Sequence, residues 1–482
     1  MSKVQPDNTL QAIISHAKEY GFVFPSSEIY DGLSAVYDYG PYGAQLKKNI
    51  RDYWWNSMTQ LNENIVGIDA AIFMHPTTWK ASGHVDSFSD PLIDNKESKK
   101  RYRVDHLIEG HADTLIAKGN NAAADKLLVD MDALLAKEDF EGLKKLIEEN
   151  KITCAVSGTS NWTEIRQFNL MFSTEIGAVA EEASTIYLRP ETAQGIFVNF
   201  LNVQKTARMK IPFGIAQTGK AFRNEIVARQ FIFRMREFEQ MEMQFFIKPG
   251  TQKEWYEHWK NERMNWHLSL GIAPEKYRFH DHVKLAHYAD AALDIEYEFP
   301  FGFKEVEGIH SRTDFDLTRH QEFSKKKMQY FDTEINQHYV PYVIETSIGL
   351  DRMFLLILAN SYEEETINKE DGTTDSRVVL HLPARLAPNK LAILPLTKKD
   401  GLPELAKELM DDCKKSFHCF YEEKDAIGKR YRRQDAIGTP FCVTIDHQTK
   451  EDGTATIRYR DSMLQERISL SKIKELVLAH IS

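Results

Sequence analysis

A stretch of alternating side chains, from Pro212 to Phe246, constrains the fold of this chain more than any other. Read as two strands joined by a short loop near Val227–Gln230, it places residues two apart on a common face. On the second strand one face collects charged groups and a ring, and the other collects Phe and Met. The charged face holds Arg234, Arg236, Phe238, Gln240 and Glu242, and the apolar face holds Phe233, Met235, Met241 and Met243. We therefore expect an antiparallel hairpin with one buried face.

The charged face of this hairpin has two interpretations. A solvated strand face is common in antiparallel sheets, although such faces usually carry Lys, Thr and Ser. Arginine binds phosphate through a planar fork and stacks on rings. With Arg223 on a phosphate, Phe238 under a base and Glu225 accepting from an exocyclic amine, the surface would bind a nucleotide. The sequence favours the nucleotide surface and leaves the solvated hairpin open.

The 482 residues are enough for about two or three domains. The N-terminal segment lacks the basic-then-apolar pattern of a secretory signal, and no apolar run reaches membrane-spanning length, so no membrane partner is expected. Cys154, Cys413, Cys419 and Cys442 form no CxxC pair, which indicates neither a zinc site nor a disulfide framework. A cytoplasmic location is the simplest expectation. The net charge of −10 argues against non-specific coating of nucleic acid but permits a local basic patch.

Helical spacing begins at Tyr42 and extends to Leu61. Apolar residues recur three or four apart on one stripe, and two further aromatic residues widen it. The stripe consists of Leu46, Ile50, Trp54, Met58 and Leu61, and Tyr53 and Trp55 flank it. The pattern predicts either a well-buried helix or a helix shared with a second subunit, because interfaces are rich in aromatic residues.

A second informative stretch follows Tyr339. Glu345 and Ser347 share one face of a predicted strand, Gly349 begins a turn, and Met353–Ala359 is apolar on every side, which is typical of a buried helix. Arg352 lies in the first turn of that helix. A buried guanidinium needs a partner, so either a ligand phosphate or a protein carboxylate is expected to meet it.

The rest of the chain divides by its composition. Residues 84–152 are rich in charge and contain amphipathic helices, which predicts an insertion, and residues 382–389 contain two prolines and a change of pattern. Beyond them strands alternate with helices, and Arg alternates with Tyr in 429–435 and 457–461. That combination suits either contact with unpaired RNA or simple solvation. Four scattered histidines lack metal-ligand spacing on one element and are expected to be structural or on the surface; they are His280, His282, His287 and His310.

Together these stretches resemble the class II aminoacyl-tRNA synthetases, and most closely the glycyl-tRNA synthetase family of the single-chain, homodimeric type. AVYDYGPYGAQLKKNIRDYWW is similar to the first class motif, FRNE through REFEQMEMQFF to the second, and GLDR with its apolar helix to the third. NWTEIRQFNLMF, LRPETAQGIF and IGKRYRRQDAIGTPFCVTID are similar to markers of the glycine enzymes. The similarity extends from about Gly21 to the end.

The resemblance implies an α+β fold. It comprises an antiparallel-sheet catalytic domain with a helical, charged insertion and a C-terminal α/β anticodon-binding domain. The expected division is 1–84 for the N-terminal catalytic part with the dimer motif, 85–160 for the insertion, 161–385 for the ATP and glycine sites, and 386–482 for the anticodon-binding domain.

The implied reaction has two steps, formation of glycyl-adenylate from glycine and ATP and then transfer of glycyl to tRNA(Gly). The resemblance assigns catalysis to Arg223, Glu225 and Arg352. It assigns ATP binding to Arg223, Asn224, Glu225, Phe233, Arg234, Met235, Arg236, Glu237, Phe238, Glu305, Val306, Gly349, Leu350, Asp351 and Arg352. It assigns glycine binding to Arg103, Glu191, Phe238, Glu239, Gln240, Met241, Glu242, Glu345, Thr346, Ser347, Ile348 and Gly349.

For partners, the resemblance implies tRNA contact by Arg432, Arg433, Arg458 and Arg460, and a homodimer through the Tyr42–Leu61 region. Mg²⁺ would arrive with ATP, and neither a fixed metal site nor zinc is expected. Thr346, Ile165 and Tyr459 depart from residues that are frequent in the family. Two alternatives are a synthetase-like protein without catalysis and a class II synthetase for serine, proline or threonine. The first would be expected to lack Arg223, Glu225 or Arg352, which are all present.

Overall fold

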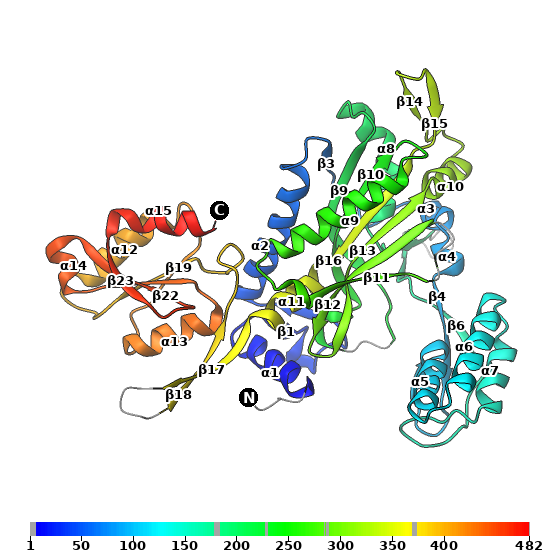
Figure 1. Cartoon of the computed structure of the whole chain (residues 1–482), viewed down its shortest axis with the longest axis horizontal. Helices are drawn as coiled ribbons and strands as arrows, with labels where there is room; N and C mark the ends of the chain where they lie inside the picture. The colour runs from blue at the N-terminus through cyan, green and yellow to red at the C-terminus, as the bar shows by residue number, and fades with distance from the viewer. Residues whose placement is uncertain are drawn as a thin grey trace.

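The computed structural model describes residues 6–177, 184–226, 230–283, 285, 289–368 and 374–481. Its centre is a seven-stranded sheet in the order β11-β12-β13-β16-β10-β9-β3 (Figure 1). Every pair of neighbours is antiparallel except β3 and β9, which are parallel. In chain order the strands are β3 (Ile65–Gly67), β9 (Phe213–Phe222), β10 (Glu237–Ile247), β11 (Tyr277–Asp281), β12 (Ala291–Phe299), β13 (Gly302–Thr313) and β16 (Tyr342–Gly349).

One face of the sheet is covered by helices. The largest core cluster joins side chains of this face to α2 (Pro41–Thr59), α9 (Gln252–Leu268) and α11 (Leu350–Ser361). A second cluster packs α8 (Ala193–Thr206) against the ends of β9, β10 and β16 on the opposite face. The rest of that opposite face, over β10, β13 and β16, borders the cleft described below.

The predicted hairpin forms, but its strands are shorter than predicted. Phe233, Met235, Met241 and Met243 are all buried, which confirms the apolar face. β9 ends at Phe222 and β10 begins at Glu237, so the predicted strand positions of Arg223, Glu225 and Arg234 were wrong. Within the segment between the strands, positive φ values at Gln230 and Phe231 take the chain out of the extended conformation. Residues 227–229 of the predicted loop lie outside the described residues.

The first long helix, α2, follows the predicted stripe for most of its length. Leu46, Ile50, Trp54 and Met58 are buried. Pro41 occupies the first turn, where a missing N–H costs no helical hydrogen bond. Leu61 lies beyond the helix end and is 77% exposed, so its predicted place in the stripe was wrong.

The insertion has its own core. A three-stranded sheet of β4 (Ser89–Asp94), β5 (Arg101–Arg103) and β6 (Arg166–Asn169) accompanies α5 (Val104–Ala117), α6 (Asn121–Ala136) and α7 (Phe140–Glu149). A separate hydrophobic cluster joins these helices to Ile152, Cys154 and Trp162. Figure 1 shows them beside the central sheet rather than within it.

The C-terminal unit is a five-stranded mixed sheet in the order β20-β19-β21-β22-β23. Its strands are β19 (Leu391–Pro395), β20 (Cys419–Tyr421), β21 (Phe441–Ile445), β22 (Thr454–Tyr459) and β23 (Gln465–Ser469), and its helices are α12 (Leu402–Cys413), α13 (Ile427–Ile437), α14 (His447–Asp452) and α15 (Leu470–Ile481). A hairpin, β17 (Tyr362–Asn368) and β18 (Thr374–Leu380), leads into it and contacts α13. The predicted alternation of strands and helices is confirmed.

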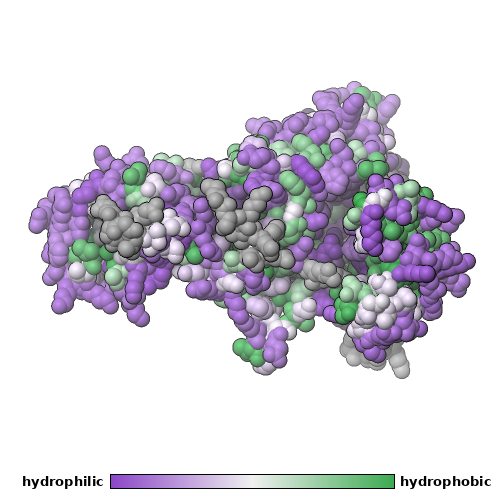
Figure 2. Space-filling view, turned by 60° about the horizontal axis from the view of Figure 1, so that its bottom comes forward, coloured by the Kyte–Doolittle hydropathy of each residue, from purple (hydrophilic) through white to green (hydrophobic). Residues whose placement is uncertain are grey.

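The remaining elements are α1 (Pro6–Glu19), β1 (Val23–Pro25), β2 (Tyr37–Tyr39), α3 (Pro76–Ala81), α4 (His84–Ser87), β7 (Ser173–Ile176), β8 (Ser184–Tyr187), α10 (Phe315–Ser324), β14 (Tyr330–Asp332) and β15 (Gln337–Tyr339). Hydrophilic residues cover most of the face seen in Figure 2, and hydrophobic residues appear there in scattered groups. Among the described residues, no helix is both long enough and apolar enough to cross a membrane.

Candidate functional site

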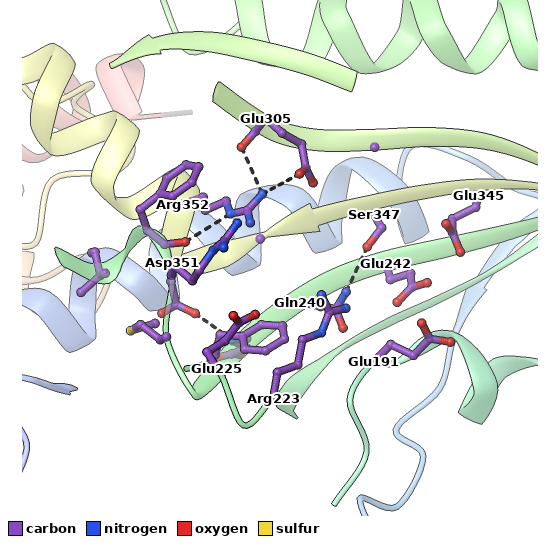
Figure 3. Close-up of a pocket in the computed structure, with 18 of the residues that line it drawn as sticks. Glu191, Arg223, Glu225, Gln240, Glu242, Glu305, Glu345, Ser347, Asp351 and Arg352 are labelled. Atoms are coloured by element: carbon purple, nitrogen blue, oxygen red, sulfur yellow. Dashed lines mark hydrogen bonds and ion pairs between the residues drawn. The ribbon is translucent and has the colours of Figure 1, made fainter. Parts of the chain in front are cut away.

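A cleft opens over the uncovered face of β10, β13 and β16. Its interior volume is about 220 Å³. Its lining residues are Glu191, Arg223, Glu225, Ile232, Phe233, Arg234, Met235, Phe238, Glu239, Gln240, Glu242, Glu305, Gly308, His310, Arg312, Glu345, Ser347, Gly349, Asp351 and Arg352. Arginines and glutamates from separate parts of the chain therefore share one cavity (Figure 3).

Two guanidiniums at one end of the cleft lie beside aromatic rings. The Arg352 guanidinium carbon is 4.5 Å from the Phe233 ring centroid, and Arg352 Nη1 lies 2.9 Å from Glu305 Oε2. The Arg223 guanidinium carbon is 5.3 Å from the Phe238 ring centroid, and its Nε donates to the Pro190 carbonyl. The two terminal nitrogens of Arg223 make no hydrogen bond within the part of the chain that the structure describes, so they can receive an anion. The protein carboxylate expected for Arg352 is therefore Glu305, and contact of Arg352 with a ligand phosphate stays a prediction.

Three glutamates gather at the other end, as Figure 3 shows. Glu242 accepts hydrogen bonds from Thr192 Oγ1 and from Gln244 Nε2, the latter at 2.8 Å. Gln244 Nε2 also donates to Glu345 at 2.7 Å. Glu242 comes from β10, Glu345 from β16, and Glu191 from the segment just before α8.

Neighbouring histidine and arginine side chains lower the pKa of two of these three carboxylates. Burial by itself would raise the pKa of Glu191, but the nearby His84, whose Nε2 lies 3.3 Å away, lowers it to about 2. Burial opposes ionisation of Glu345 too, yet Arg312 at 3.0 Å and His310 at 2.7 Å hold its pKa well below the usual range.

The third carboxylate, Glu242, has a raised rather than a lowered pKa. Burial and the charges of Glu345 and Glu191 raise its pKa well above the usual value. The hydrogen bond from Thr192 and the charge of Arg312 only partly offset this rise in pKa. A ligand cation placed among the three carboxylates would favour ionisation of Glu242. The cleft therefore combines an anion-binding end with a cation-binding end.

Alternation along the strands excludes several predicted residues from the cleft. Met241 and Ile348 join the core on the opposite sheet face, and Thr346 is buried between strands. Val306 and Leu350 also belong to that core. The side chains of Met241, Thr346 and Ile348 point away from Glu242 and Glu345 because successive residues of a strand face opposite sides of the sheet, so contact of these side chains with a ligand was wrongly predicted. The contact predicted for the Val306 backbone stays a prediction.

Other predicted residues lie outside the lining of the cleft. Arg236 donates to the carbonyls of Glu225 and Ser34, so it holds the loop rather than a ligand. Glu237 forms an exposed ion pair with Lys220. Asn224 is also absent from the lining. Arg103 pairs with Asp90 at 3.1 Å and with Asp105 at 2.6 Å within the insertion.

The structure adds four lining residues that the sequence reasoning did not assign to the site: Ile232, Gly308, His310 and Arg312. The last three alternate along β13, so a period-two reading could have found them. His310, expected to be structural or on the surface, forms a hydrogen bond to Glu345 inside the cleft.

A charged network supports the floor of the cleft. Asp351 accepts hydrogen bonds from the Glu239 backbone and from Lys47, both at 2.7 Å, and from the Tyr39 hydroxyl. Glu239 pairs with Arg51 at 3.0 Å. Asp351 and Glu239 thus connect the site to α2, and they are oriented by protein groups.

The four arginines predicted for tRNA contact separate into two pairs. Arg458 and Arg460 are buried: Arg458 forms two hydrogen bonds to Asp435, and Arg460 donates to the carbonyls of Gly438 and Leu382. Their predicted contact with RNA was wrong for this structure, because both forks are occupied inside the protein. Arg432 and Arg433 are more than one third exposed.

Comparisons with known proteins cover almost the whole chain. Three protein-family models match the chain. The model of the tRNA synthetase class II core domain (G, H, P, S and T) matches residues 172–361, and that of glycyl-tRNA synthetase insertion domain 1 matches residues 90–127 and 117–170. The model of the anticodon binding domain matches residues 390–480. The chain is 56% identical to the glycine–tRNA ligase of Chlorobaculum tepidum over 97% of this chain and 99% of that protein. It is 50% identical to the glycine–tRNA ligase of Treponema denticola over 96% of this chain and 95% of that protein.

The chain belongs to the glycine–tRNA ligase family. The family assignment accounts for a class II core and an anticodon-binding domain in one chain, and it confirms the predicted fold class. Class II synthetases in general use ATP and Mg²⁺, which suits the anion-binding end of the cleft.

Proposed function

We propose that this chain joins glycine to tRNA(Gly) in two ATP-dependent steps within the cleft. The observation that carries the proposal is that Arg223 and Arg352 line the same cavity as Glu191, Glu242 and Glu345. A triphosphate can be held at one end while an ammonium is held at the other. A single aminoacyl-adenylate would occupy both ends of the cavity.

In the first step an oxygen of the glycine carboxylate bonds to the α-phosphorus as the bond to pyrophosphate breaks. No protein nucleophile is required, so the residues act by alignment and by stabilising charge on the phosphate. Arg223 contacts the α-phosphate, Phe238 stacks on the adenine, and Arg352 covers the base and reaches the γ-phosphate. Glu225 accepts from the adenine amine. Mg²⁺ enters with ATP as part of the substrate, beside Glu305.

In the second step a hydroxyl of the terminal tRNA ribose attacks the glycyl carbonyl, and AMP leaves. The ammonium stays among Glu191, Glu242 and Glu345 during both steps. These carboxylates also occupy the space into which a Cβ would project, so larger amino acids overlap with them. Exclusion by overlap is effective against larger substrates and makes a separate editing site unnecessary.

The proposal includes the organisation around the cleft. The domains are 1–84, 85–160, 161–385 and 386–482, and two copies associate through the Tyr42–Leu61 region. Arg432 and Arg433 contact tRNA, and the protein acts in the cytoplasm. Cys154, the cysteine of the insertion, is not accompanied there by a second one, so no zinc is proposed for that region.

The test is amino-acid-dependent exchange of pyrophosphate into ATP by the purified chain. We expect exchange with glycine and none with serine, alanine, proline or threonine. Exchange with serine or alanine but not with glycine would show that the amino-acid assignment is wrong. If no amino acid supports exchange, the chain is a synthetase-like protein without catalysis.

A further inference from the structure

Three potential metal ligands from neighbouring strands meet at the edge of the cleft. His282 directly follows β11, Asp294 lies on β12, and His310 lies on β13. One ligand atom from each lies within 4.8 Å of the other two. All three side chains are partly accessible, so an ion can reach them.

Strand register explains why these residues meet. The His282 backbone N–H donates to the Ala292 carbonyl, and Ala292 lies opposite His310 in the β12–β13 ladder. Asp294 is two residues beyond Ala292 and therefore shares its face. The imidazoles of His282 and His310 therefore lie on either side of Ala292 in β12, whose side chain is only a methyl group. The Asp294 carboxylate projects beside them.

A glycine leaves room for the cluster. Gly308 lies opposite Asp294. A Cβ at this position would be 3.1 Å from His310 Cε1, 3.3 Å from His310 Nε2 and 3.7 Å from Asp294 Oδ1. The absent side chain lets the imidazole edge and the carboxylate approach the same space.

A carboxylate outside the cluster orients one of the two rings. His282 Nε2 lies 2.9 Å from Asp294 Oδ2, a contact between two members of the cluster. His310 Nδ1 lies 2.7 Å from Glu345 Oε1, which leaves Nε2 as the available nitrogen of His310. A histidine whose second nitrogen bonds to a carboxylate is the arrangement that orients metal-bound imidazoles in many sites.

We propose that His282, Asp294 and His310 form a Zn²⁺ site at the edge of the cleft. Two imidazoles and one carboxylate suit zinc, whereas Mg²⁺ prefers oxygen ligands and water. Three protein ligands leave one position for water or for an oxygen of a ligand in the cleft. The ion would fix the His310 tautomer and thereby the hydrogen bond to Glu345. The expectation that zinc is absent rested on cysteine patterns and on histidine spacing within one element, and a cluster across three strands escapes both criteria.

A second group within the described residues is less suitable. Glu363, Glu365 and His381 also lie close enough to share an ion. Both ring nitrogens of His381 already bond to carboxylates, Nδ1 to Asp461 at 2.6 Å and Nε2 to Glu365 at 3.0 Å. His381 thus provides a control for zinc binding elsewhere.

The experiment is a Zn²⁺ titration of tag-free, chelator-treated protein by calorimetry, with Co²⁺ absorption in the visible range as a second readout. We expect one Zn²⁺ per chain with a Kd below about 10 µM, and a d–d spectrum of low coordination number with Co²⁺. His282→Ala and Asp294→Asn should each weaken binding by about tenfold or more. His280 lies two residues before His282 and is bonded to Glu296. His280→Ala and His381→Ala should bind zinc like the unaltered protein. Circular dichroism verifies the fold of each variant.

Two outcomes would overturn the proposal. One is that the unaltered protein binds well under one zinc ion per chain. The other is that His282→Ala and His280→Ala bind zinc equally. Neither measurement uses glycine, ATP or tRNA, so failure of the zinc site and failure of the proposed reaction are distinguishable.

Discussion

Replacement of Glu242 by glutamine should make the protein more stable and a poorer enzyme. Glu242 is the one carboxylate of the three whose pKa is raised well above its usual value, by burial and by Glu345 and Glu191. Glutamine keeps the size and can keep both contacts, with its carbonyl accepting from Gln244 and its amide donating to the Thr192 hydroxyl. The variant therefore removes a charge without leaving a cavity.

The sign of the stability effect follows from proton linkage. Because the pKa of Glu242 is higher in the folded than in the unfolded chain, its contribution to stability is complete below the unfolded pKa and is lost as pH rises through the folded pKa. A permanently neutral glutamine avoids that loss. At neutral pH we expect a gain of about 0.5–2 kcal/mol, which raises Tm by roughly 1–4 °C for a long chain. The gain should shrink as the pH falls toward about 5.

The effect on function is opposite and larger. One charged hydrogen bond to the glycine ammonium is lost, at a cost of about 1.5–3 kcal/mol. The KM for glycine in pyrophosphate exchange should rise roughly 10- to 150-fold, with a small change in the KM for ATP. Glu237→Gln is the matched control, since Glu237 is on the same strand but pairs with Lys220 outside the cleft. The reasoning would be refuted if Glu242→Gln left the glycine KM within about twofold and Tm unchanged across the pH range.

Three further predictions concern the arginines. Arg223→Ala should lower the rate of adenylate formation about 10²-fold or more, because one contact to transition-state charge is lost; a change confined to tRNA charging would contradict its place on the α-phosphate. Arg432→Ala or Arg433→Ala should weaken tRNA charging and leave pyrophosphate exchange intact, and equal loss of both activities would exclude the proposed division of labour. Arg458→Ala should destabilise the C-terminal unit by about 3 kcal/mol in chemical denaturation, since it breaks a buried pair with Asp435; unchanged stability with weaker tRNA binding would restore Arg458 as a tRNA contact.

The sequence predicted those parts of the cleft that depend on local periodicity. Alternation on β10 and β16 correctly separated Met241 and Met243 from Glu242, and Glu345 from the core. Errors arose where whole motifs were assigned to the site and this alternation was ignored. Thr346 and Ile348 were included with the ligand contacts, although their side chains face away from the cleft.

Contacts between distant segments could not be predicted from the sequence. In the sequence, nothing distinguishes Arg458 from the other arginines of its basic segment. In the structure its guanidinium is hydrogen-bonded to Asp435, 23 residues earlier. The approach of His84 to Glu191 likewise depends on how the start of the insertion meets the catalytic sheet. The junction of β11, β12 and β13 brings His282 and His310 together for the same reason, since strand register is set by tertiary structure.

The Asp351 carboxylate has a consequence for synthesis of the protein. Its oxygens are engaged by Tyr39, 312 positions earlier, by Lys47, 304 positions earlier, and by the Glu239 backbone, 112 positions earlier. A chain still emerging from the ribosome cannot close this junction until Asp351 has been added and has cleared the exit tunnel. The ATP end of the cleft should therefore be absent from any nascent fragment that stops before residue 351, and nucleotide binding would report the moment at which the catalytic part is complete.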